Sequence, residues 1–114
     1  VVVAPPKEEI VTYVEEDAEF PGGYAEMMRF FQKNMKYPEL AVQAGIQGKA
    51  SLRFVVDKEG SISDVRVVKG VPNCPECDKE AIRVVRSMPK WKPGKVGGKA
   101  VKSYYNMPVT FKLQ

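Results

Sequence analysis

The sequence predicts an α+β fold, a two-layer sandwich in which helices cover one face of a three-stranded antiparallel sheet. Three observations predict it. Two alternating segments flank the turn D-K-E-G at residues 57–60, which indicates a β-hairpin. Segments before and after this hairpin carry apolar residues at helical spacing. A last alternating segment closes the chain, so the expected order is α-(short α)-β-β-α-β.

At 114 residues, the chain has room for one domain. Residues 1–19 are rich in Val, Pro and Glu and show no helical period, so we interpret them as an acidic linker that ends in an extended segment over residues 10–14. The domain is then expected over residues 20–114. The chain begins at Val1 rather than at a methionine, so we expect it to be part of a longer protein.

The first helical segment follows the breaker F-P-G-G at residues 20–23 and is expected over about residues 24–34. Tyr37 ends it, because a residue that precedes proline is disfavoured in the α region. Pro38 suits the start of a short second helix over residues 39–44, and Gly45 ends that helix.

The hairpin strands are expected to bury one face each. In the first strand, which Gly48 opens, every second residue is apolar, and the returning strand repeats the pattern with Val65 and Val67. The apolar face of the first strand consists of Ala50, Leu52, Phe54 and Val56. The next helix is expected over about residues 78–88, with Asp78 as its N-cap or first-turn acid.

The end of the chain predicts an edge strand. After W-K-P-G, whose Trp91 we expect in the core, residues 96–100 are interpreted as a glycine-rich loop and residues 101–113 as the last strand. Pro108 lies inside that strand and donates no hydrogen bond, so its missing N–H is expected on the open side of an edge. Such an edge can recruit a strand from another chain.

Composition excludes several kinds of catalysis. The chain has no histidine, so it cannot form a Ser-His-Asp or Cys-His catalytic group or a His-ligated zinc site. Acidic residues gather before residue 20, and the rest of the chain is basic. Because the basic residues are scattered over the predicted elements, we interpret them as a solvated surface rather than a nucleic-acid site.

The two cysteines form the motif C-P-E-C at residues 74–77, before a helix. Three roles are open for Cys74 and Cys77: a redox pair, a metal ligand pair shared across a dimer, or a local disulfide or free thiols. A thioredoxin-like pair follows a parallel strand, whereas this pair follows a hairpin strand. We therefore expect a protein that is not an enzyme, with a thiol–disulfide oxidoreductase as the alternative.

Five motifs resemble the TonB C-terminal domain family in order and spacing, over about residues 20–113. They are Y-P at 37–38, G-x-x-G at 45–48, D-x-x-G at 57–60, W-x-P-G at 91–94 and the closing P-V-T-F-K-L at 108–113. F-P-G-G and S-M-P-K-W-K-P-G resemble the version found in Bacteroidetes.

The resemblance implies a periplasmic domain of a protein that is anchored in the inner membrane and driven by a proton-powered motor complex. Such a domain binds the TonB box, a peptide of outer-membrane receptors, by β-strand addition to its last strand. The binding serves the import of siderophores, cobalamin or glycans and needs no cofactor. Isolated domains of the family can also form homodimers, for which an open edge gives a physical reason. A similar domain at the end of a sensor or peptidase is the further alternative.

The resemblance and the predicted edge together give the candidate site residues. Those for the receptor peptide are Lys102, Tyr104, Asn106, Val109, Thr110, Phe111 and Lys112. Tyr37 and Pro38 match the Y-P motif, and Asn34 stands where the family has an important polar residue, so these three are expected to contact the receptor. Leu40 stands where some members carry an arginine. The oxidising periplasm favours a disulfide between Cys74 and Cys77.

Overall fold

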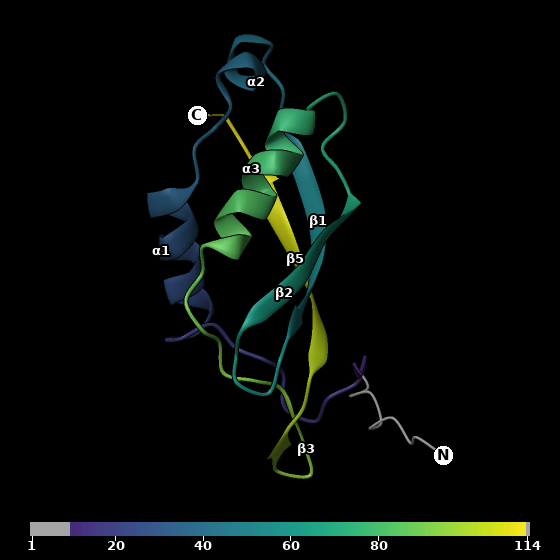
Figure 1. The fold of residues 1–114 in the computed structure, drawn as a ribbon. Coiled ribbons are helices and arrows are strands. Elements are labelled where there is room, and N and C mark those ends of the chain that lie inside the picture. The colour runs from purple at the N-terminus through teal and green to yellow at the C-terminus, as the bar shows by residue number, and fades with distance from the viewer. Residues whose placement is uncertain (1–9, 114) are drawn as a thin grey trace, which may run out of the picture.

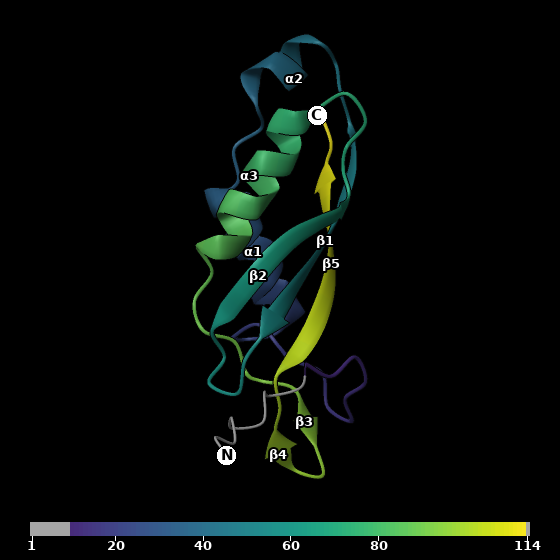
Figure 2. The ribbon, with the colours of Figure 1, turned by 45° about the vertical axis from the view of Figure 1, so that its right-hand side comes forward.

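The computed structural model describes residues 10–113 and confirms the predicted fold class. Its elements are α1 (Tyr24–Asn34), α2 (Glu39–Gln43), β1 (Gly48–Val56), β2 (Ile62–Lys69), α3 (Pro75–Arg86), β3 (Lys95–Val96), β4 (Lys99–Ala100) and β5 (Ser103–Phe111). β2, β1 and β5 form an antiparallel sheet in that spatial order. α1 and α3 lie on the same side of this sheet (Figures 1 and 2). No helix of residues 10–113 is long and apolar enough to span a membrane.

The core lies between the sheet and the helices, as the alternation in β1 predicts. The four apolar side chains named above for β1 are all fully buried. Trp91 belongs to this core and is also buried, which confirms its expected place. Its ring packs edge-on against Phe54, Phe20 and Tyr105, with centroids 5.3, 6.0 and 4.8 Å away. Such pairs stabilise a core beyond the apolar area that they bury.

The turn of the β1–β2 hairpin contacts the segment that follows α3. The Asp57 carboxylate accepts the N–H groups of Glu59 and Ser61, both at 2.9 Å. Gly60 has φ +89°, and its carbonyl accepts the N–H of Trp91 at 2.9 Å. A Cβ atom at this position would lie 1.9 Å from the Trp91 carbonyl oxygen. Only glycine therefore fits this close backbone approach.

α3 begins three residues earlier than predicted, at Pro75. Cys74 is its N-cap, and Pro75 takes the first turn, where its missing N–H costs nothing. Of the two positions expected for Asp78, Cys74 takes the N-cap, and the position in the first turn is confirmed. Asp78 lies inside the helix, and its carboxylate accepts the N–H of Val71 at 2.9 Å, which joins α3 to the loop before it.

The connection between α3 and the last strand also differs from the prediction. Residues 96–100, expected to be a loop, belong to a small hairpin in which β3 pairs with β4. Gly97 and Gly98 form its turn, both with positive φ. Because this hairpin uses the chain up to residue 100, the last strand begins at Ser103 rather than at Val101, and it ends at Phe111 rather than at Leu113.

Residues 10–19 lie against the domain, and we call them the N-terminal strap. Val11 forms a parallel bridge with Ser103, while Glu16 and Glu19 form antiparallel bridges with Lys95 and Lys92. The strap is the described part of the predicted linker; residues 1–9 lie outside the described residues. The domain boundary at residue 19 stays a prediction, but the described part of the linker contacts the fold.

Candidate functional site

β5 is an edge strand whose inner side is fully paired. Its nine residues pair with β1 in one continuous register, from Phe111 opposite Gly48 to Ser103 opposite Val56. The β1–β2 ladder, in contrast, contains two register shifts. β5 is therefore attached to the rest of the domain by the more regular ladder of the sheet.

The direction of the free backbone groups follows from the bridge to the N-terminal strap. The Tyr104 N–H donates to the Val11 carbonyl at 3.1 Å, and the Lys102 carbonyl accepts the Val11 N–H at 2.9 Å. Both groups point away from β1. Because backbone groups alternate along a strand, the same side carries those of Asn106, Pro108 and Thr110.

Pro108 thus stands where sequence reasoning expects it, with its missing N–H on the open side. Asn106 and Thr110 supply the N–H groups of this edge beyond Tyr104. Apart from the ladder to β1, to which these two groups do not point, no backbone hydrogen bond within residues 10–113 reaches either of them. The open edge thus offers two amide donors, separated by a position that cannot donate.

The even-numbered side chains of β5 lie on the sheet face opposite the helices. Asn106 and Thr110 are exposed, and Tyr104 is partly buried. The guanidinium carbon of Arg53 lies 4.5 Å from the centroid of the Tyr104 ring, a cation–π contact that ties β1 to β5 on this face. Lys102, partly buried, and Lys112, exposed, flank the strand and add positive charge.

Two predicted contact residues have a different environment. Val109 and Phe111 are 3% and 1% exposed and face the helices. Their backbone groups point to β1, opposite Ala50 and Gly48. The structure therefore places both side chains in the core, where they support the strand but do not line its open edge.

Asn34, Tyr37 and Pro38 are all partly buried, and Tyr37 lies beside the end of β5. The Tyr37 hydroxyl donates to the Ile46 carbonyl, and its ring packs edge-on against Phe111 at 5.5 Å. The Asn34 side chain donates to the Phe30 carbonyl at 2.9 Å. The Tyr37 contacts hold the α1–α2 connection against the sheet, whereas the Asn34 bond lies within α1.

A shallow pocket of about 330 Å³ separates this connection from α3. Lys36, Tyr37 and Pro38 line one side, and Glu80 and Arg83 are among the residues of the other. Arg83 donates to Glu80 and to the Asn34 carbonyl, and Glu80 also accepts the Lys36 N–H. The hydrogen bond from Arg83 lowers the pKa of the Glu80 carboxyl below its usual value. Nearby, Leu40 is 65% exposed on α2.

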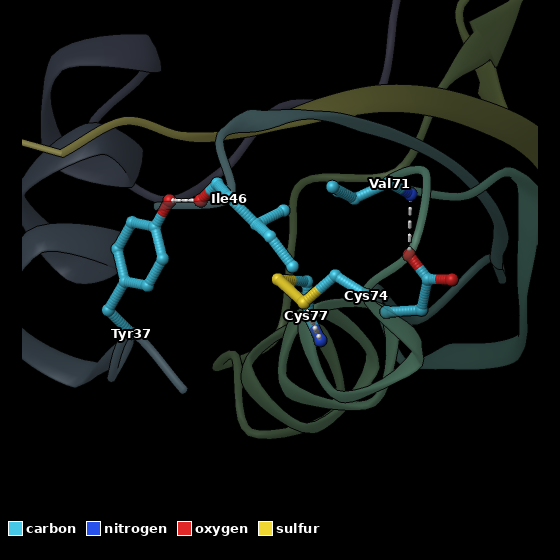
Figure 3. The surroundings of a disulfide bond; sticks show 6 residues. Tyr37, Ile46, Val71, Cys74 and Cys77 are labelled. Atoms are coloured by element: carbon cyan, nitrogen blue, oxygen red, sulfur yellow. Dashed lines mark hydrogen bonds between the residues drawn. A yellow bond between two sulfur atoms is a disulfide. The ribbon is translucent and has the colours of Figure 1, made fainter. Parts of the chain in front are cut away.

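Cys74 and Cys77 form a disulfide inside the first turn of α3 (Figure 3). Both residues are fully buried, and the Cys74 sulfur accepts the Cys77 N–H at 3.1 Å. Thiol–disulfide exchange needs access to a sulfur atom. The buried position fits a structural cross-link at the helix start and argues against the oxidoreductase alternative. Among residues 10–113, no cluster of acidic or sulfur-containing side chains could hold a metal ion.

Sequence reasoning missed the contact between the N-terminal strap and β5. The signal was present in the charges, because the strap is acidic and the segment that it crosses, residues 90–99, is rich in lysine. Opposite charges on two segments do not fix which residues pair, so the bridge at Ser103 required the structure.

Comparisons with known proteins agree on one family. The model of the Gram-negative bacterial TonB protein C-terminal family matches residues 33–113. The chain is 32% identical over 80 residues to Protein TonB of Pseudomonas aeruginosa, covering 68% of this chain and 22% of that protein. It is 36% identical over 86 residues to Protein TonB of Xanthomonas campestris, covering 71% of this chain and 37% of that protein. The chain thus spans between about a fifth and somewhat over a third of these relatives.

Solved structures show the same fold. The solution structure of the Pseudomonas aeruginosa TonB C-terminal domain is similar with a TM-score of 0.57 and 28% identity, over 70% of this chain and 79% of that one. A Helicobacter pylori TonB C-terminal domain has a TM-score of 0.56 at 20% identity, over 77% of this chain and 90% of that one. The matched family model covers most of the chain, including the whole sheet and α3, and the chain belongs to the TonB C-terminal domain family.

Proposed function

We propose that this domain binds the TonB box of outer-membrane receptors by β-strand addition to the open edge of β5. The observation that carries the proposal is the outward row of backbone groups from Asn106 to Thr110, which have no backbone partner within residues 10–113, on a domain of this family. In the proposed setting, the domain lies in the periplasm as part of a protein anchored in the inner membrane. It transmits energy from a proton-driven motor complex for the import of a siderophore, cobalamin or a glycan.

Strand addition suits a domain that serves receptors of differing sequence. Affinity comes from main-chain hydrogen bonds, which any residue except proline can form, and side chains add selectivity. From Asn106 to Thr110 the edge extends about 13 Å at about 3.3 Å per residue. A peptide of roughly five residues can therefore pair with it.

The sheet also suits a domain that pulls on its partner. A peptide on β5 would be attached to the strand with the longest continuous ladder to β1. β1 in turn is the central strand and carries fully buried side chains. Tension on the peptide would therefore pass into the core of the domain rather than into a loop.

The open edge also makes a homodimer a competing state. Two β5 strands that paired with each other would occupy the N–H groups of Asn106 and Thr110. We therefore expect receptor peptides to reduce self-association of the isolated domain.

The test is a titration of the ¹⁵N-labelled domain with synthetic TonB-box peptides from receptors of its own organism. We expect amide shifts along residues 101–113, with the largest changes at Asn106 and Thr110. A peptide of the same length with alternate residues replaced by proline is the control, because it cannot form the ladder. Shifts confined to the pocket between Tyr37 and α3 would contradict edge pairing.

A further inference from the structure

We propose that the tip of the N-terminal strap, residues 10–14, is an internal competitor for the receptor peptide. It occupies the beginning of the β5 edge and has to leave before a peptide pairs along the whole strand. This inference rests on the proposed function, because it concerns the same edge.

The tip occupies the edge through one residue. Val11 accepts the N–H of Tyr104 and donates to the carbonyl of Lys102, which are the first two outward-facing groups of the edge. A receptor peptide that pairs along β5 from its beginning needs the same two groups. The tip and such a peptide cannot bind there together.

The rest of the strap is held more firmly than the tip. The Glu15 and Glu16 N–H groups donate to the Lys95 carbonyl, and the Lys95 N–H donates back to Glu16 at 2.9 Å. Glu19 exchanges two further hydrogen bonds with Lys92. Ala18 is buried between these pairs. The strap therefore has an anchored part, residues 15–19, and a tip with a single bridge.

The chain passes close to Gly94 where the tip joins the anchored part of the strap. A Cβ atom on Gly94 would lie 3.1 Å from a Val14 methyl carbon and 3.3 Å from the Glu16 carbonyl oxygen, so glycine allows the strap to approach. The Glu15 carboxylate accepts the Gly97 N–H at 3.1 Å. Within the tip, Tyr13 is 75% exposed. The anchored part can thus stay in place while the tip leaves.

Release of the tip changes what the edge offers. With the tip bound, the outward donors are the N–H groups of Asn106 and Thr110, because Pro108 has none. Without it, the N–H of Tyr104 becomes a third donor and the carbonyl of Lys102 a further acceptor. The tip is held by two backbone hydrogen bonds, and each shifts an equilibrium by roughly two- to tenfold, so removal of one of them should tighten peptide binding about fivefold.

The substitution Val11→Pro tests this, because it removes the N–H that bonds Lys102. Thr12→Pro is the matched control, since in a parallel bridge the Thr12 N–H points away from β5. We measure the affinity of both variants and of the unchanged domain for the synthetic TonB-box peptide. V11P should bind about fivefold more tightly than the unchanged domain, and T12P should equal it.

A second measurement uses the unchanged domain and does not depend on either variant. The Val11 amide should exchange slowly in the free domain and rapidly when peptide saturates it. A peptide that shifts the β5 amides while Val11 stays protected would overturn the competition but leave the proposed function standing. Equal affinity of V11P and the unchanged domain, with the Tyr104 amide deprotected in V11P, would overturn it as well. If no peptide binds either protein, the proposed function fails and this inference with it.

Discussion

Replacement of Thr110 by proline should weaken peptide binding and leave the fold intact. Thr110 contributes one of the two outward N–H groups of β5 beyond Tyr104, and this group makes no backbone hydrogen bond within residues 10–113. Proline at this position removes a donor that the folded domain does not use. Pro108, two residues earlier on the same edge, shows that the strand tolerates this residue.

The expected loss of peptide affinity follows from the number of outward N–H donors. T110P halves the donors available beyond Tyr104, from two to one. The net value of one backbone hydrogen bond is about 1 kcal/mol, with a range of about 0.5–1.5, so the dissociation constant should rise about fivefold. The free energy of unfolding should change by less than about 1 kcal/mol, because the ladder between β5 and β1 keeps every hydrogen bond.

The dissociation constant is measured by isothermal titration calorimetry of the purified variants with the synthetic TonB-box peptide. Urea denaturation gives the free energy of unfolding of each variant. Thr110→Val is the matched control, because it keeps the N–H and alters only the exposed side chain. Pro108→Ala is the reverse change, and the N–H that it adds should tighten binding by a similar factor. If T110P binds as tightly as T110V while both are folded, the peptide does not pair with this edge.

Three further predictions concern the scaffold. Gly60→Ala should lower the free energy of unfolding by more than about 3 kcal/mol in urea denaturation, because it combines positive φ with a backbone clash. Gly97→Ala has positive φ but open space around the new Cβ atom, so it should cost about 1–2 kcal/mol. Similar costs for the two variants would contradict the close approach at Gly60. Replacement of both Cys74 and Cys77 by alanine should cost less than the roughly 3 kcal/mol of a disulfide that closes a 15-residue loop and leave peptide affinity unchanged; a loss of binding by a folded variant would refute a purely structural role. Because the pKa of Glu80 is lowered in the folded domain, its stabilising contribution is complete above the ordinary pKa of 4.5 and is lost as the pH falls through the folded-state pKa. Glu80→Gln should therefore reduce the loss of unfolding free energy on acidification. An identical loss for both proteins in urea denaturation between pH 7 and 3 would contradict the contact of Glu80 with Arg83.

The sheet and α1 follow from the sequence because their signals are local and repeated. Strict alternation from Gly48 to Val56 specifies which face is buried, and one register error would expose every apolar side chain of the strand. Pro108 predicts the open edge for an equally direct reason, since a missing N–H is tolerated only where no partner strand is needed.

The features that sequence reasoning missed depend on tertiary contacts. β3 and β4 have two residues each, too few for a periodic pattern. The bridge of Val11 involves one residue and is set by where the anchored strap directs the chain. For Asp78 the sequence leaves the N-cap and the first turn open, and its bond to the Val71 N–H required the structure.

The candidate site residues also include some that the sequence pattern places and some whose contacts require the structure. Period-2 alternation, once the edge is placed, puts Asn106 and Thr110 on the open side, and the structure agrees with that arrangement. Val109 and Phe111 are also candidate site residues, although the same alternation places their side chains in the core. The contact of Tyr37 with Phe111 joins two candidate regions that lie far apart in the sequence.

Amide hydrogen exchange with and without the TonB-box peptide tests the central claim most directly. In the free domain, the amides of Asn106 and Thr110 should exchange rapidly, while those of Val109 and Phe111, bonded to β1, should exchange slowly. At saturating peptide, Asn106 and Thr110 should become protected, and the other two should change little. Binding that leaves Asn106 and Thr110 unprotected would contradict strand addition at β5.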